Sequence, residues 1–259
     1  MKIRSLFIIF LITVIIPCCI SPFGVIHCSD ETVEFSGKPI GTFSQLEFQQ
    51  ACHASITAGD SYSVVIVISE NISNHLDIDK EGQLVRFSLH SGYTYENLTF
   101  KVSITMPVLK SVHAGGASTV ALSGFETSDG FSAELSGASK LDGDLECGPA
   151  AFTLSGASTL TGTITCSDMT LDLSGASRIE TDGKARNISC EASGASTVKM
   201  RNQRCGDMSL NLSGASSMHA SPSGAIHGEL SGASVFYYYG SPTVGKFDLS
   251  GGSTVRKAD

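Results

Sequence analysis

The sequence predicts an all-β fold, a parallel β-helix (a solenoid) with coils of about 19 residues. The first observation is a phrase of four small residues, Ser-Gly-Ala-Ser or a close variant, which occurs eight times. The second is its spacing, because successive copies follow one another after 18 to 21 residues, as in a repeat architecture. The third is that no segment has the 3.6-residue apolar spacing of an amphipathic helix. The central glycines are Gly116, Gly137, Gly156, Gly175, Gly194, Gly214, Gly232 and Gly251.

Two apolar positions flank each copy of the phrase. Two residues before the glycine the chain usually carries leucine, as at Leu154 and Leu173, and four residues after it an apolar residue follows, as at Leu160. In a strand that alternates sides, both positions point inward. The small residues between them require a tight bend, which glycine tolerates. We therefore expect the eight glycines to form the corner of each coil. A leucine-rich repeat has a similar period, but its asparagine ladder and helical half are absent from the sequence.

Serine follows the corner in every copy, from Ser118 to Ser253. If this column faces inward, each hydroxyl can bond either to the next coil or to a corner carbonyl. This structural explanation accounts for the phrase without any ligand.

Residues 1–19 are predicted to be a signal peptide or an N-terminal anchor. Basic residues precede an apolar stretch from Leu6 to Ile16, which is too short to span a bilayer comfortably. Plain secretion, an uncleaved anchor and lipidation at Cys18 or Cys19 all remain open. The body of the chain is therefore expected outside the cytoplasm, either extracellular, at the cell surface or in the periplasm. Any membrane contact is expected through this segment alone.

The rest of the chain divides into three parts. Residues 20–41 are expected to form a linker or an edge strand, because Pro and Gly interrupt any long element. Residues 42–112 alternate less regularly and are predicted to form a β-rich N-terminal cap and the first coils, since an open solenoid end needs covering. Residues 113–259 are predicted to form the regular coils. The tyrosines of the segment 236–239 could cover the last coil or contact a partner.

Six cysteines follow the predicted signal segment, and export would allow them to oxidise. Cys147 and Cys166 occupy the same repeat position one coil apart, which makes a disulfide between them possible in an exported chain. The alternative is that they pack as buried free thiols. The cysteine spacings resemble no zinc site, so we expect no metal there.

Charge limits the classes of partner. The formal net charge of −8 and the lack of a basic patch argue against nucleic acid. One outward column is acidic at five of its eight positions, three residues before the glycine: Glu134, Asp172, Glu191, Glu229 and Asp248. Stacked carboxylates could bind Ca²⁺, act as an acid–base pair, or form a solvated face that keeps the solenoid soluble. No other cofactor is expected.

Several segments of the chain resemble the "putative autotransporter adhesin head GIN" domain family (DUF2807). They are Phe43–Leu46, Val64–Glu70, Gly82–Leu84, Val102–Leu109 and the repeated phrase, so the resemblance covers roughly residues 42–255. It implies a right-handed parallel β-helix and an exported or surface-exposed protein. The family provides no catalytic residues to carry over to this chain.

Three functions fit these observations. The favoured one is a non-catalytic binding or adhesion protein of the cell surface or envelope, engaging an extended glycan or an envelope protein. The coils are too uniform for the long loops that usually build a cleft, and no catalytic triad or phosphate loop occurs. One alternative is a polysaccharide-active enzyme that uses a carboxylate pair such as Asp172 and Glu191. The other is a structural protein that assembles into larger envelope structures.

Overall fold

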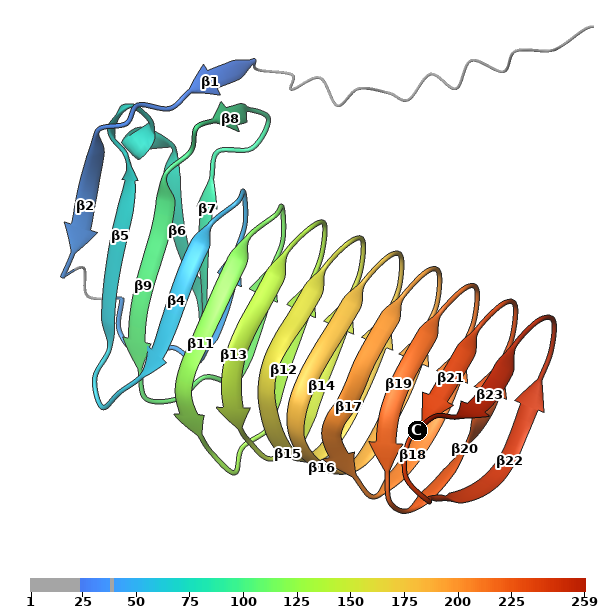
Figure 1. The fold of residues 1–259 in the computed structure, drawn as a ribbon. Coiled ribbons are helices and arrows are strands. Elements are labelled where there is room, and N and C mark those ends of the chain that lie inside the picture. The colour runs from blue at the N-terminus through green and yellow to red at the C-terminus, as the bar shows by residue number, and fades with distance from the viewer. Residues whose placement is uncertain (1–23, 38–39) are drawn as a thin grey trace, which may run out of the picture.

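The structure, a computed structural model, describes residues 24–37 and 40–259. Strands make up 63% of it and helix 3%, and parallel coils of about 19 residues stack into a solenoid of about eight turns (Figure 1). The predicted all-β parallel β-helix is therefore confirmed. The predicted signal peptide, residues 1–19 with Cys18 and Cys19, lies outside the described residues.

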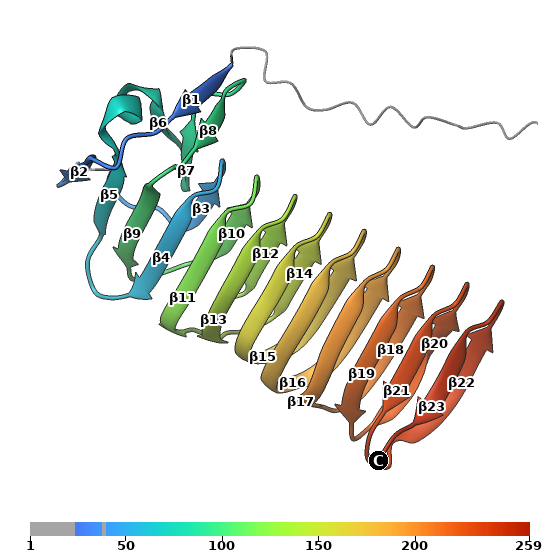
Figure 2. The ribbon, with the colours of Figure 1, turned by 45° about the horizontal axis from the view of Figure 1, so that its top comes forward.

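Two strand ladders run along the solenoid and enclose its core (Figure 2). We call them sheet I and sheet II. Sheet I contains, in spatial order, β6 (Leu76–Glu81), β7 (Leu84–Leu89), β3 (Gln45–Phe48), β10 (Ser111–Ala114), β12 (Phe131–Leu135), β14 (Ala150–Leu154), the second halves of β15 (Thr159–Leu173) and β16 (Arg178–Ala192), β18 (Asp207–Leu212), β20 (Ala225–Leu230) and β22 (Thr243–Leu249). Sheet II contains β2 (Thr32–Ser36), β5 (Ser63–Ser69), β9 (Phe100–Met106), β4 (His53–Ala58), β11 (Thr119–Glu126), β13 (Lys140–Glu146), the first halves of β15 and β16, β17 (Thr197–Cys205), β19 (Ser217–Pro222), β21 (Val235–Tyr238) and β23 (Thr254–Lys257).

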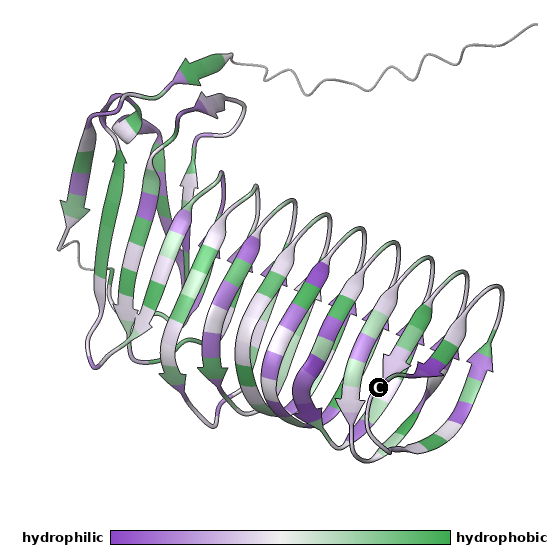
Figure 3. Ribbon diagram, viewed as in Figure 1, coloured by the Kyte–Doolittle hydropathy of each residue, from purple (hydrophilic) through white to green (hydrophobic). Residues whose placement is uncertain are grey.

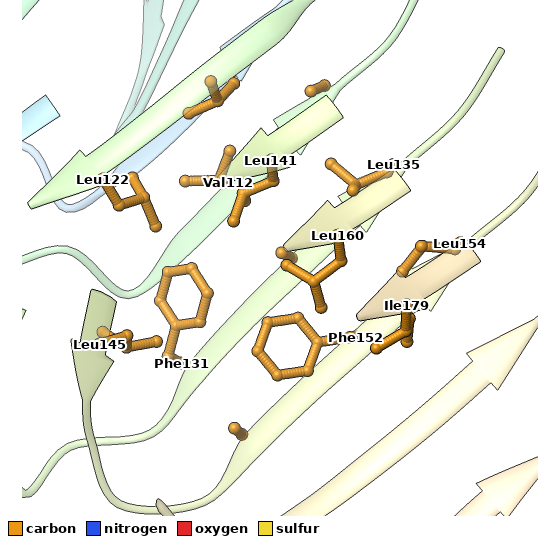
Figure 4. Close-up of a cluster of buried hydrophobic side chains, with 14 of the residues drawn as sticks. Val112, Leu122, Phe131, Leu135, Leu141, Leu145, Phe152, Leu154, Leu160 and Ile179 are labelled. Atoms are coloured by element: carbon orange, nitrogen blue, oxygen red, sulfur yellow. The ribbon is translucent and has the colours of Figure 1, made fainter. Parts of the chain in front are cut away.

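The core lies between the sheets and includes the two predicted apolar columns. Leu154 and Leu160, on either side of one corner, are both fully buried, and equivalent residues of the adjacent coils stack on them (Figure 4). Hydropathy alternates along the strands, which agrees with one face inward and one outward (Figure 3). Burying each such side chain stabilises the fold by about 1.5–3 kcal/mol.

The glycine column forms the corners, as predicted. Gly175 has φ +72°, a left-handed conformation that side chains other than glycine rarely adopt. A Cβ atom there would also lie 2.5 Å from the carbonyl oxygen of Gly156 in the preceding coil. The corner glycines from Gly156 onward share both constraints, so they are required by backbone conformation and by stacking.

The serine that follows the corner glycine bonds within its own corner in all eight phrases, and it is buried in all but the last, where Ser253 is partly exposed. The Oγ of Ser177 donates to the carbonyl oxygen of Ser174 at 2.7 Å, and the Oγ of Ser196 does the same to Ser193. Of the two arrangements expected from the sequence, the corner carbonyl is the partner, and the hydroxyls do not form a chain along the solenoid axis. The column therefore fixes the shape of each bend.

The N-terminal part caps the solenoid with antiparallel strands. The segment 20–41 contains β1 (Val25–His27), which pairs with β8 (Thr94–Glu96), and β2, which is the edge strand of sheet II. Within 42–112, β3 and β4 form the first coil, and β5 and β9 pair antiparallel beside it. A short 3-10 helix, η1 (Glu70–His75), follows β5. These strands cover the first open end.

Within residues 24–37 and 40–259 the other end of the solenoid is open, because strands β22 and β23 pair with a neighbouring strand on one side only. Leu249 belongs to the inward leucine column but is 49% exposed, whereas Leu230, one coil earlier, is 1% exposed. Among the tyrosines of this region, Tyr238 packs against the core beside Phe236, with ring centroids 6.1 Å apart.

Candidate functional site

The five predicted acidic residues do form one exposed column on the outer face of sheet I. Register pairs Asp172 with Glu191 and Glu229 with Asp248, so these carboxylates stand on neighbouring strands. Thr153 lies between Glu134 and Asp172 in the stack, and an asparagine separates Glu191 from Glu229. The acidic column is therefore two adjacent pairs and one single carboxylate.

The column continues toward the cap on strands that precede the repeats, through Glu47 and Arg86, which the spacing from the glycines did not identify. Glu134 pairs with His113, Nδ1 to Oε2 at 3.1 Å, and His113 is followed in register by Glu47 and then Arg86. Arg86 Nε contacts Glu47 Oε2 at 3.0 Å, and these interactions hold the pKa of the Arg86 guanidinium above its usual value. Carboxylate side chains alternate here with His113 and Arg86, beside a hollow of about 230 Å³ that includes Gln49.

The acidic column offers limited metal-binding geometry. Within residues 24–37 and 40–259, no group of three or more His, Cys, Asp or Glu side chains is arranged to hold a metal ion. Lys246 Nζ already contacts Asp248 Oδ2 at 2.8 Å. Calcium binding by this column therefore stays a prediction, and it would need water or ligand oxygens to complete the coordination shell.

Cys147 and Cys166 are both buried and both free thiols in the structure. They occupy equivalent positions of adjacent coils, since Cys147 N donates to the carbonyl oxygen of Thr165. Burial raises the pKa of the Cys147 thiol to about 11 and that of Cys166 to about 12. The thiols are therefore protonated at neutral pH, and the disulfide between them stays a prediction.

A second candidate site lies on the outer face of sheet II, near the open end. We call it the aromatic hollow; its volume is about 310 Å³, and it is lined by Glu180, Asp182, Lys199, Arg201, Asn202, His219 and Tyr239. The His219 ring stacks on Tyr237 with centroids 4.5 Å apart and planes 16° from parallel. The guanidinium carbon of Arg201 lies 4.4 Å from the ring centroid of Tyr239, within the range of a cation–π contact.

Unequal coil lengths create the hollow. The coil from Gly194 to Gly214 has 20 residues, and the next one, to Gly232, has 18. In the β17–β19 ladder Met200 pairs with Ala220, and Arg204 pairs with the next residue, Ser221, so the intervening residues 201–203 bulge. The bulge exposes Arg201 and Asn202 and turns Gln203 into the core. Because the short coil leaves space there, Arg201 reaches Tyr239 two coils away.

Two cations, Lys199 and Arg201, and two carboxylates, Glu180 and Asp182, line the hollow. Glu180 forms an ion pair with Arg178, which lowers the pKa of that carboxyl group. Among the described residues, neither Lys199 nor Arg201 forms an ion pair with a side-chain carboxylate. Burial first, and then Lys199 and Arg201, lower the pKa of His219.

Sequence reasoning identified the acidic column but missed the aromatic hollow. The sequence does contain a pattern that could have located the hollow, in the outward column five residues after the corner glycines. The residues that follow one another in register there are Glu180, Lys199, His219, Tyr237 and Arg256. The change from acidic to basic and aromatic residues along one outward column marks the hollow.

No helix in the described ranges has the length and apolar character needed to cross a membrane. Any anchoring by the N-terminal segment concerns residues outside these ranges.

Comparisons with solved structures identify the same architecture in bacterial proteins. A "putative lipid binding protein" from Parabacteroides distasonis superposes with a TM-score of 0.84 at 14% identity, over 91% of this chain and 100% of that one. A "putative adhesin" from Parabacteroides merdae gives a TM-score of 0.83 at 15% identity, over 91% and 99%. At such identities the likeness concerns the fold alone. No curated protein matches the chain significantly.

The sequence itself matches a family profile described as "Putative auto-transporter adhesin, head GIN domain" (DUF2807) over residues 42–242. This range contains the first coil, most of the cap and all the corners but the last. The chain belongs to the DUF2807 head GIN domain family.

Proposed function

We propose that the chain is an exported, non-catalytic adhesion protein that binds an extended glycan at the cell surface or in the envelope. The observation that carries the proposal is the outward column of sheet I, in which ten consecutive strands each present one polar side chain in register. They are Arg86, Glu47, His113, Glu134, Thr153, Asp172, Glu191, Asn211, Glu229 and Asp248. A polymer with repeated hydroxyl groups can hydrogen-bond to successive side chains of this row, so many weak contacts add up along its length.

The family description and the names of the structural neighbours support an adhesion-type role. They do not identify the partner, and one neighbour is named as a lipid-binding protein instead. We favour a glycan because the exposed columns offer carboxylate, amide and hydroxyl groups, which are the partners that sugar hydroxyls use. An envelope protein is the alternative partner.

A second candidate function, hydrolysis of a polysaccharide, rests on the pairing of Asp172 with Glu191 on neighbouring strands. Neighbouring strands lie about 4.8 Å apart, which is near the carboxylate separation of retaining glycosidases. Both side chains are exposed on a strand face. A raised pKa for a general acid normally requires a less solvated setting, so binding is the better-supported function.

A glycan array probed with the exported chain, with and without Ca²⁺, tests the proposal. We expect retention on particular polysaccharides and its weakening by Asp172→Asn with Glu191→Gln. A variant with Asp142→Asn, on the outer face of sheet II, serves as the control. Calcium-dependent retention would support metal binding by the acidic column. A blank array would refute glycan binding, and light scattering over a concentration series would then test self-assembly. Cleavage of a retained polysaccharide that the double variant abolishes would establish the enzyme instead.

A further inference from the structure

The aromatic hollow combines three features in one place. It has an aromatic surface, two cations that form no ion pair with an Asp or Glu side chain, and a concave shape of about 310 Å³. We propose that it binds a single carboxylated sugar residue of the glycan, an inference that rests on the proposed function and assigns its ligand class.

The aromatic surface provides the apolar part of such a site. His219 and Tyr237 are stacked, and His219 Nδ1 lies 3.1 Å from the hydroxyl of Tyr239. These contacts join three rings from adjacent coils into one preorganised surface. The carbon-bound hydrogens on one face of a pyranose ring are apolar and carry a small positive charge, so they pack favourably against the negative face of an aromatic ring.

The cations provide the charge selectivity. Arg201 is held over Tyr239 and donates from Nη2 to the main-chain oxygen of Asp259, the last residue of the sequence, at 3.2 Å, which leaves other N–H groups of the guanidinium for a ligand. Lys199, on the same strand, is exposed beside it. A planar guanidinium matches a carboxylate in geometry and can donate two parallel hydrogen bonds to it.

One of the two carboxylates that line the hollow is already engaged in an ion pair. Glu180 is occupied by Arg178, and Arg256 follows Tyr237 in register on β23. That leaves Asp182 as the one lining carboxylate outside an ion pair, and with Asn202 it can hydrogen-bond to the hydroxyl groups of a sugar. The size of the hollow is at the lower end of ligand sites, which suits one sugar unit of a longer chain.

The test compares a galacturonic acid tetramer with its methyl ester, in which neutral ester groups replace the carboxylates, by calorimetry on the full chain. We expect the acid to bind at least tenfold more tightly than the ester. Arg201→Gln should remove this preference, and Tyr237→Ala should weaken the binding of both ligands. Arg204→Gln is the matched control, because Arg204 is an exposed arginine of the same strand outside the hollow.

Three results would overturn the inference: equal binding of acid and ester, equal effects of Arg201→Gln and Arg204→Gln, and no binding of the acid at millimolar concentration. The glycan array separates this failure from that of the proposed function. If Arg201→Gln leaves array retention unchanged, the glycan is bound elsewhere on the solenoid and only the assignment of the hollow is wrong. If the wild-type array is blank as well, both are wrong.

Discussion

Replacing a corner glycine by alanine should destabilise the solenoid for two separable reasons. At Gly175 the left-handed backbone (φ +72°) costs a side-chain-bearing residue about 1–2 kcal/mol. The added Cβ would also lie 2.5 Å from the Gly156 carbonyl oxygen, which accepts the hydrogen bond from Ala176 N at 2.7 Å. Relieving the clash requires the coils to separate and weakens that bond, which is worth about 1 kcal/mol. We expect Gly175→Ala to lower the free energy of unfolding by about 3 kcal/mol or more.

Two other glycines allow the two contributions to be measured separately. Gly82, in the turn between β6 and β7, has φ +60°, and a Cβ atom there would meet nothing within 4 Å, so Gly82→Ala reports the backbone cost alone. Gly228 does not have a left-handed backbone, but its Cβ would lie 2.1 Å from the Leu210 carbonyl oxygen, so Gly228→Ala reports the clash alone. The entropy that alanine removes from the unfolded chain is similar in all three variants and cancels in the comparison.

The assay is equilibrium unfolding in guanidinium chloride followed by circular dichroism, with the wild type and the three variants side by side. Gly82→Ala should cost about 1–2 kcal/mol, and Gly175→Ala clearly more than Gly82→Ala. Equal losses for Gly175→Ala and Gly82→Ala would refute the stacking argument, because the corner would then need glycine for its backbone alone.

Three further predictions concern the core, the thiols and the hollow. Leu173 is 1% exposed, so Leu173→Ala should lower the free energy of unfolding by about 2–5 kcal/mol in the same assay. Leu249 is 49% exposed, so Leu249→Ala should lower it by less than about 1.5 kcal/mol. Similar losses for the two variants would mean that the open end is covered in solution. Alkylation of the native chain at pH 7.5 should leave Cys147 and Cys166 unmodified, because burial raises the pKa of both thiols. If the two cysteines form a disulfide, mass spectrometry after alkylation in denaturant would show two fewer adducts than for the chain with both thiols free. The pKa of His219 measured by NMR should lie below 6.5, so as the pH falls this side chain is protonated in the unfolded chain before it is protonated in the folded one. The stability that neutral His219 contributes is therefore present above pH 6.5 and is lost as the pH falls through the folded pKa. Lys199→Gln should raise that pKa, and a His219 pKa above 6.5 would contradict the effect of burial and of the two cations on this side chain.

The regular coils were predictable because each corner imposes the same constraint on the sequence. Leu154 and Leu160 had to be apolar to reach the core, and the residues between them had to be small to stack. The first corner was not predictable in this way. There Gln50 and Ala51 take positive φ values of 52° and 55° without any glycine, and Ala51 N donates to the carbonyl oxygen of Gly116 in the next coil. Tertiary stacking enforces a conformation that the local sequence does not favour.

The candidate sites differed in predictability for a related reason. The acidic column follows directly from the repeat, since any residue three before the glycine points outward and stacks on its equivalents. The aromatic hollow depends on a difference between neighbouring coils, namely the bulge at Arg201 opposite a coil two residues shorter. A repeat alignment averages such differences away, so only the register in the structure brings Arg201 to Tyr239.

This contrast bears on where a β-solenoid can place a specific binding site. Coils of equal length present the same outward positions again and again, which suits a repeating polymer but cannot distinguish one sugar from another. Discrimination needs a place where the coils differ, and a two-residue mismatch between neighbours is enough to bring side chains from four coils around one hollow. In this chain the mismatch coincides with the change from acidic to basic and aromatic residues in the outward column of sheet II. We therefore expect substitutions in the acidic column to weaken binding of every glycan that the chain retains, and a substitution of Arg201 to change which glycans are retained.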